Sequence, residues 1–142
     1  MFHRLTDDYH VAPQIEVADL VAAAEQGFAL VINNRPDGEE PDAPQGEAIA
    51  AAAREAGIAY VAVPVGHGGF SHAQLDALDA ARAAHPGKVL AYCRSGTRSA
   101  HLWALASARG GAEPGALCDA AAAAGYDLAM LRPMLTSLSA GA

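Results

Sequence analysis

Short apolar runs alternate with longer amphipathic segments along most of the chain. The runs of strand length are 2–5, 9–11, 28–32, 58–65 and 89–92. The segments with helical spacing or helix-end signals are 15–26, 47–56, 71–84, a stretch beginning near residue 97, 114–124 and 128–138. Strands that alternate with helices every 25–30 residues predict an α/β domain. We therefore expect one three-layer domain over residues 1–142, with a central, mostly parallel sheet and helices on both faces.

Particular positions sharpen this prediction. The run Phe28–Ile32 has no polar residue, which is typical of a strand buried on both faces. The stretch 15–26 predicts a helix that ends before Gly27. Its apolar positions at helical spacing are Val17, Leu20, Val21 and Ala24. Ser71 is the expected N-cap of the helix that follows it.

Composition changes the expected packing. Hydrophobic residues make up 52% of the 142 residues, but 36 residues are alanine. Large apolar side chains are therefore few, and the core should come from short strands covered by closely packed, alanine-faced helices. A chain of this length can bury enough surface to fold without disulfides, and its two cysteines cannot form a disulfide framework.

Charge and hydropathy exclude several function classes. The net charge of −7 argues against nucleic acid or an anionic membrane as the main partner, because both require a basic face. No apolar run approaches the roughly 20 residues that cross a bilayer, and the N-terminus lacks a signal-peptide pattern. The six histidines show no metal-ligand spacing. We expect a cytoplasmic domain without a cofactor or metal.

The segment CRSGTRS, residues 93–99, carries the candidate chemistry at a strand-to-helix junction. Ligands of open α/β sheets bind at the carboxyl ends of strands. Cys93 ends the predicted strand, where loop N–H groups and a helix N-terminus stabilise a thiolate. Arg98 can donate to two oxygens of a tetrahedral anion, and Arg94 adds positive charge. Ser99 is placed to donate to the sulfur.

The residues between the two arginines complete an anion-binding loop. Gly96 permits a positive φ, so that the backbone N–H groups of Ser95, Gly96 and Thr97 can turn inward. Two non-catalytic interpretations of this loop stay open. Cys93 is then either a buried cysteine at the end of a strand or part of a pocket that binds an anion without catalysis. By contrast, we interpret Cys118 as a core cysteine and Trp103 as a packing residue.

Three motifs together resemble one known family. The segments YCRSGTRSAHLWAL, ALVINNRPDGEEP and AAAAGYDLAMLRP are similar to the β-lactamase-hydrolase-like phosphatase-like domain family, over about residues 2–133. Members of that family are labelled both phosphatase and sulfurtransferase. The resemblance implies a fold like the dual-specificity protein tyrosine phosphatases, in which a central strand also ends at the nucleophilic cysteine.

Two features depart from the tyrosine phosphatase pattern. Four residues separate Cys93 from Arg98, one fewer than in the tyrosine phosphatase signature, and CRSGTRS also looks like the persulfide-carrying loop of rhodaneses. The loop after residues 58–65 lacks the aspartate that serves as general acid in dual-specificity phosphatases. The candidates for that role are Asp37 and His67, and Arg35 is a candidate anion-binding residue.

The leading hypothesis is a cysteine-nucleophile hydrolase that acts on a small phosphate ester or a phosphoprotein. A rhodanese-type sulfurtransferase that forms a persulfide on Cys93 is the alternative, and an anion or redox sensor is the third. In the first two cases the partner is a small anionic substrate, either a phosphate ester or a sulfane-sulfur donor. The sequence leaves the oligomeric state open.

Overall fold

The computed structural model describes residues 2–66 and 68–142, which build a sheet in the order β1-β2-β5-β3-β4. The strands of this described part are β1 (His3–Thr6), β2 (Tyr9–Ala12), β3 (Phe28–Asn33), β4 (Ala59–Ala62) and β5 (Lys88–Tyr92). The β1–β2 hairpin is antiparallel, and all other neighbours are parallel. The four parallel strands thus end at the same edge of the sheet.

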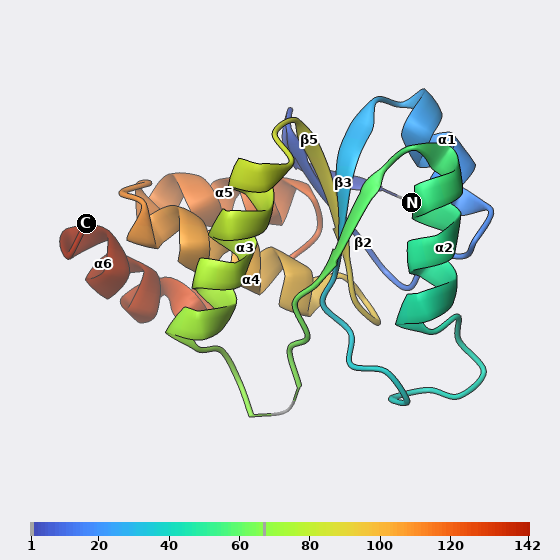
Figure 1. Ribbon diagram of the computed structural model, residues 1–142. Coiled ribbons are helices and arrows are strands. Elements are labelled where there is room, and N and C mark those ends of the chain that lie inside the picture. The colour runs from blue at the N-terminus through green and yellow to red at the C-terminus, as the bar shows by residue number, and fades with distance from the viewer. Residues whose placement is uncertain (1, 67) are drawn as a thin grey trace.

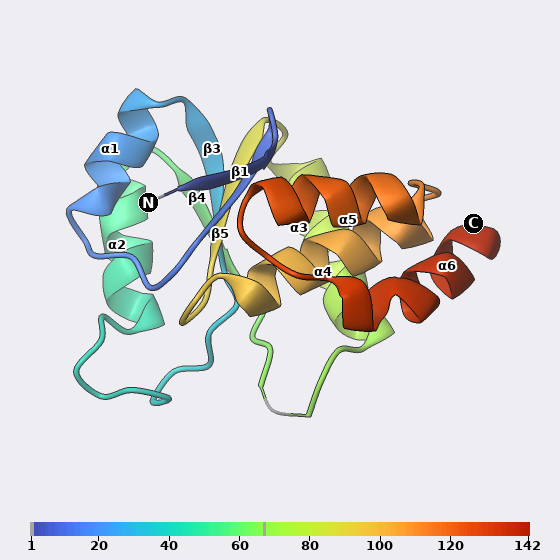
Figure 2. The ribbon, with the colours of Figure 1, turned by 180° about the vertical axis from the view of Figure 1, so that it is seen from behind.

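Helices cover both faces of this sheet (Figure 1 and Figure 2). One face carries α1 (Asp19–Glu25) and α2 (Gly46–Ala56). The other carries α3 (His72–Ala84), α4 (Thr97–Arg109), α5 (Pro114–Ala123) and α6 (Arg132–Ala140), with the short 3-10 helix η1 (Ala129–Leu131) before α6. This arrangement confirms the expected three-layer α/β domain with a mostly parallel sheet.

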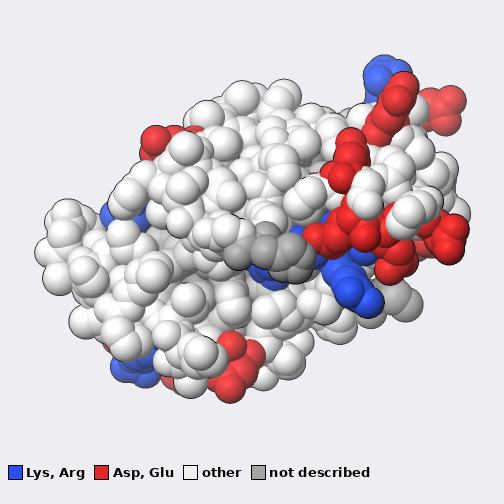
Figure 3. All heavy atoms as spheres, turned by 90° about the horizontal axis from the view of Figure 1, so that it is seen from below, with Lys and Arg blue, Asp and Glu red and all other residues white. Residues whose placement is uncertain are grey.

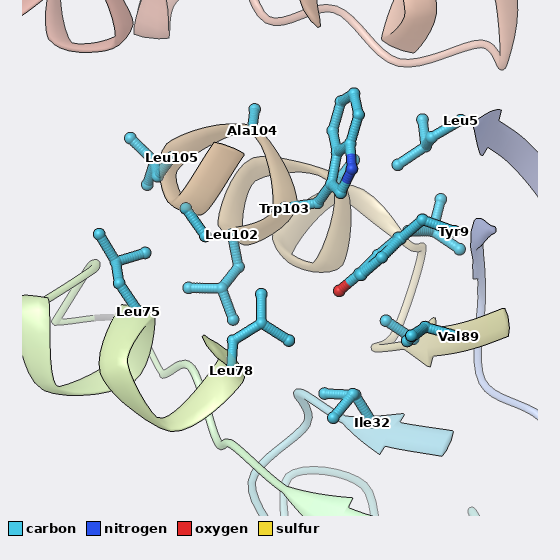
Figure 4. Packing of buried hydrophobic residues seen from close by; sticks show 14 of the residues in the cluster. Leu5, Tyr9, Ile32, Leu75, Leu78, Val89, Leu102, Trp103, Ala104 and Leu105 are labelled. Atoms are coloured by element: carbon cyan, nitrogen blue, oxygen red, sulfur yellow. The ribbon is translucent and has the colours of Figure 1, made fainter. Parts of the chain in front are cut away.

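The larger core lies between the sheet and helices α3 to α6, and α4 runs through its middle (Figure 4). Eight of the thirteen α4 residues are buried, and Ala100, Ala104 and Ala108 are fully so. Small side chains let the neighbouring elements approach α4 closely. Trp103 of α4 packs beside Tyr9 of β2, with ring centroids 6.3 Å apart, as expected for a packing residue. The loop before α4 therefore leads into a helix that is packed within the core.

Several predicted boundaries and one predicted face are wrong. The helix predicted over 15–26 begins only at Asp19, because the Asp19 carboxylate accepts the Glu16 backbone N–H and closes a turn before it. Leu20 and Ala23 of α1 face the core, whereas Val17, which precedes α1, and Val21 are 47% and 61% exposed. The predicted helix 128–138 is divided into η1 and α6, whose first turn contains a proline.

The predicted strand 58–65 pairs with β3 only over Ala59–Ala62, but its extended backbone continues beyond that ladder. The Val63 and Val65 N–H groups donate to the Asn33 and Asn34 carbonyl oxygens at 2.9 Å each. This continuation carries Val65 to the edge where the parallel strands end. The predicted Ser71 cap is confirmed, since Ser71 and Gln74 form a reciprocal capping box. No helix in residues 2–66 and 68–142 is long and apolar enough to cross a membrane.

Candidate active site

Cys93 lies directly after β5 and is fully buried beneath the loop that leads into α4. Gly96 caps α4 with a left-handed φ of +92°, and its backbone N–H donates to Cys93 Sγ at 3.1 Å. That φ is accessible to glycine and strained for other residues. The sulfur thus faces the N-terminal end of a thirteen-residue helix, where the helix dipole favours a negative charge.

Tyr126, which the sequence analysis did not single out, supports this loop from outside. Its hydroxyl donates to the Ser95 carbonyl oxygen at 3.2 Å. A Cβ atom on Gly96 would collide with the same hydroxyl. Burial raises the pKa of Tyr126, so the phenol stays protonated at neutral pH. Tyr126 and Gly96 therefore fit each other and fix the curvature of the loop.

The remaining loop residues differ in exposure. Ser95 and Thr97 are exposed, and their hydroxyls bond each other at 2.9 Å. Arg94 is also exposed, while its carbonyl oxygen accepts the Gln14 N–H at 3.3 Å. The structure places these residues in the same loop as Cys93, as the sequence implies, and their anion-binding role stays a prediction.

Ser99 is fully buried, and its hydroxyl donates to Asn34 Oδ1 at 2.8 Å instead of to the sulfur. Asn34 is equally buried and must satisfy its polar atoms inside the protein. Its amide nitrogen donates to the Val63 carbonyl oxygen at 2.8 Å. Ser99 thus joins α4 to the end of β3 in this structure.

A carboxylate that the sequence analysis overlooked occupies the centre of the site. Glu39 Oε1 accepts from Arg98 Nη2 at 2.7 Å and from Arg35 Nε at 2.8 Å. Glu39 Oε2 accepts from Arg98 Nη1 at 2.9 Å. The hydrogen bonds from Arg98, and then those from Arg35, lower the pKa of Glu39 to about 2. Glu39 is therefore ionised at neutral pH.

Arg98, in the first turn of α4, bonds to Glu39 and to the end of the segment that follows β4. Its Nη1 also donates to the Val65 carbonyl oxygen at 2.7 Å. Hydrogen bonds to Glu39 are the main cause that raises the pKa of Arg98. Figure 3, which looks onto this end of the sheet, shows acidic and basic side chains gathered together beside the loops.

The two predicted acid candidates have different outcomes. Asp37 Oδ1 accepts the Gly46 backbone N–H at 2.8 Å, so the carboxylate caps the start of α2. His67 lies outside the described residues. Arg35, the predicted anion binder, is 7% exposed and donates to Glu39 and, through Nη1, to Gln14 Oε1 at 2.9 Å.

Two further observations concern alternative chemistry. Cys118 is half-buried on α5 and packs against the larger core, as expected for a core cysteine. In the part of the chain that the structure describes, no group of three or more His, Cys, Asp or Glu side chains could hold a metal ion.

Comparison with known proteins identifies the family. The sequence model of the family described as "Beta-lactamase hydrolase-like protein, phosphatase-like domain" matches residues 1–110. The chain belongs to this family. A beta-lactamase hydrolase-like protein of Xylella fastidiosa is 42% identical over 95 residues, which are 67% of this chain and 22% of that protein. The chain thus spans about a fifth of the length of this curated relative.

Solved structures of other proteins share the fold of this chain. The crystal structure of a candidate phosphatase from Neisseria meningitidis has a TM-score of 0.84 and 29% identity, and covers 96% of this chain and 97% of that one. Tk-PTP in its active form has a TM-score of 0.71 and 18% identity, and covers 98% of this chain and 96% of that one. This phosphatase-like domain therefore has the protein tyrosine phosphatase-like fold that the sequence resemblance implied.

Proposed function

We propose that this domain is a cysteine-dependent phosphatase that hydrolyses phosphate monoesters. The observation that carries the proposal is Cys93 Sγ at the N-terminus of α4, 3.1 Å from the Gly96 nitrogen, with Arg98 in the first turn of the same helix. A cysteine thiolate is a strong nucleophile, and a backbone N–H at a helix N-terminus is a donor that stabilises negative charge on sulfur. The same donors attract a dianionic phosphoryl group.

The reaction proceeds in two displacements. In the first, the Cys93 thiolate attacks phosphorus, the S–P bond forms, and the bond from phosphorus to the leaving oxygen breaks. The leaving oxygen carries away the electron pair and takes up a proton. In the second, water attacks phosphorus and loses a proton, the S–P bond breaks, and the thiolate returns as inorganic phosphate leaves. Arg98 and the loop N–H groups hold the phosphoryl oxygens in both steps.

The source of the proton for the leaving oxygen determines which esters react. Glu39 cannot supply it at neutral pH, because its pKa is about 2. Asp37 holds the first turn of α2, and His67 stays a candidate acid. Esters whose leaving group is stable as an anion need no such acid, so aryl phosphates are the favoured substrates.

A rhodanese-type sulfurtransferase is the second candidate, and the four-residue spacing between Cys93 and Arg98 favours it. The Cys93 thiolate would attack the outer sulfur of thiosulfate, a new S–S bond would form, and sulfite would leave with the electron pair of the broken S–S bond. The persulfide would then pass its outer sulfur to cyanide or a thiol. No general acid is required.

Two cysteine variants test the proposal with a matched control. Hydrolysis of p-nitrophenyl phosphate should be lost in Cys93→Ser and kept in Cys118→Ser, since Cys118 lies on α5, outside the anion-binding loop. Sulfur transfer from thiosulfate to cyanide is measured on the same samples. Equal hydrolysis by the wild type and Cys93→Ser would refute the phosphatase, and sulfur transfer without hydrolysis would establish the second candidate.

A further inference from the structure

The hydrogen bonds of Arg98 use one side of its guanidinium and leave the other free. A guanidinium has five N–H donors in a fixed plane. Nη1 donates its two N–H groups to Glu39 Oε2 and the Val65 carbonyl oxygen, and Nη2 donates one N–H to Glu39 Oε1. Within the described residues, Nε–H and the second Nη2–H of Arg98 donate to no protein oxygen.

These two unused donors lie on one edge of the guanidinium plane. Nε–H and the adjacent Nη2–H point in parallel, which is the arrangement that binds two oxygens of one phosphoryl group. Glu39 takes the other fork, formed by Nη1 and Nη2. The carboxylate therefore engages Arg98 without covering the edge that an oxyanion needs. Arg98 lies in the first turn of α4, directly after the loop whose Gly96 N–H donates to Cys93 Sγ.

Glu39 is itself held from a second direction. Arg35, whose side chain is 6% exposed, donates to Glu39 Oε1 from Nε and to Gln14 Oε1 from Nη1. Gln14 follows β2, Arg35 and Glu39 follow β3, Val65 follows β4, and Arg98 follows β5. This chain of contacts joins the loops after all four parallel strands, and Glu39 is the member that bonds to both arginines.

We propose that Glu39 is a positioning residue, which orients Arg98 so that its Nε–Nη2 edge faces the phosphoryl group at Cys93. The inference rests on the proposed phosphatase function and adds the group that prepares its anion site. The opposite role for a carboxylate so close to an arginine is competition with the substrate for that arginine. The two roles predict opposite effects on anion binding, because a competitor weakens it and a positioning residue strengthens it.

Glu39→Gln tests the inference, with Glu40→Gln as the matched control. Both changes remove one negative charge from the same loop. The Glu40 side chain, however, is 48% exposed, and within the described residues its one ion pair is with Arg35, at 3.5 Å. We expect Glu39→Gln to lower kcat/KM for p-nitrophenyl phosphate about 10- to 100-fold, as small misplacements of a positioned group do. It should also weaken inorganic phosphate binding in calorimetric titration. Glu40→Gln should leave both quantities near wild-type values.

Two further variants separate positioning from a purely structural role. Glu39→Asp keeps a carboxylate and should therefore retain a higher kcat/KM than Glu39→Gln, although it disturbs packing at least as much as Glu39→Gln does. In an Arg98→Lys background, Glu39→Gln should have little further effect, because its action passes through the guanidinium. The pH–rate profile should keep its shape in Glu39→Gln, since Glu39 does not titrate near neutral pH.

Three results would overturn the inference alone. Tighter phosphate binding in Glu39→Gln would make Glu39 a competitor. Equal kcat/KM and equal phosphate binding in Glu39→Gln and Glu40→Gln would show that Glu39 has no positioning role. An undiminished effect in the Arg98→Lys background would place its action elsewhere. A wild-type protein that neither binds phosphate nor hydrolyses the ester would instead refute the proposed function, and the inference with it.

Discussion

Replacement of Gly96 by alanine should destabilise the protein and disable the site for two separable physical reasons. The first is the backbone, because φ at Gly96 is +92° and a side chain in this left-handed region costs about 1–2 kcal/mol. The second is space, because the new Cβ would collide with the hydroxyl and ring of Tyr126. Such overpacking costs about 1–3 kcal/mol.

Gly57→Ala supplies the control for the backbone cost. Gly57 has a similar φ of +78° at the end of α2, but nothing lies within 4 Å of the added Cβ. We expect Gly57→Ala to cost about 1–2 kcal/mol and Gly96→Ala about 2–5 kcal/mol, which at about 3 °C per kcal/mol lowers Tm by about 3–6 and 6–15 °C. Differential scanning calorimetry measures both shifts.

A double-mutant cycle with Tyr126→Ala isolates the collision. With the tyrosine removed, the added Cβ still meets the Ala12 carbonyl carbon at 3.3 Å. Gly96→Ala should then cost slightly more than Gly57→Ala, and the coupling energy with Tyr126 should be about 1–3 kcal/mol. Hydrolysis should fall in Gly96→Ala alone, because a displaced loop no longer aims its N–H at the sulfur. An equal cost of Gly96→Ala with and without Tyr126 would refute this explanation.

Three other predictions concern charge and leaving group. Arg98→Ala should reduce the rise in Tm that inorganic phosphate gives the wild type, since a two-oxygen contact is lost; an unchanged rise would put the anion elsewhere. Glu39 has a folded-state pKa of about 2, below the ordinary 4.5, so its stabilising contribution is full above about pH 5 and is lost as the pH falls toward 2. After allowance for solvent screening the contribution is about 1–2 kcal/mol, and urea unfolding at pH 3 and 6 should show a smaller difference in Glu39→Gln than in the wild type; equal differences would contradict this. The kcat/KM for phenyl phosphates should rise steeply as the leaving phenol becomes more acidic, and a flat dependence would show that an efficient general acid is present.

Local chemistry explains why much of the fold could be predicted from the sequence. Cys93 to Ser99 form a continuous strand-loop-helix unit, so their order alone indicates that the cysteine faces a helix N-terminus. Ser71 caps α3 through residues three positions away, which is also a local interaction. The three-layer arrangement follows from the alternation of strands and helices.

Contacts between distant segments explain what the sequence did not reveal. Glu39 and Arg98 are 59 positions apart, and an acidic residue in a loop rich in proline and acids resembles any solvated loop carboxylate. Tyr126 reaches Ser95 across 31 positions. The exposure of Val21 has the same origin, because spacing alone does not fix which side of a short helix meets the sheet. The one indication of the Glu39 contact in the sequence is Arg35, which lies in the same acid-rich loop as Glu39.

The covalent intermediate on Cys93 tests the central claim most directly. The wild-type protein is mixed with p-nitrophenyl phosphate, quenched in acid within the first turnover, digested and examined by mass spectrometry. The account predicts one phosphoryl group on the peptide that contains Cys93 and none on the peptide that contains Cys118. Turnover without a phosphoryl group on Cys93, or a persulfide on Cys93 after thiosulfate in a protein that does not hydrolyse the ester, would contradict it.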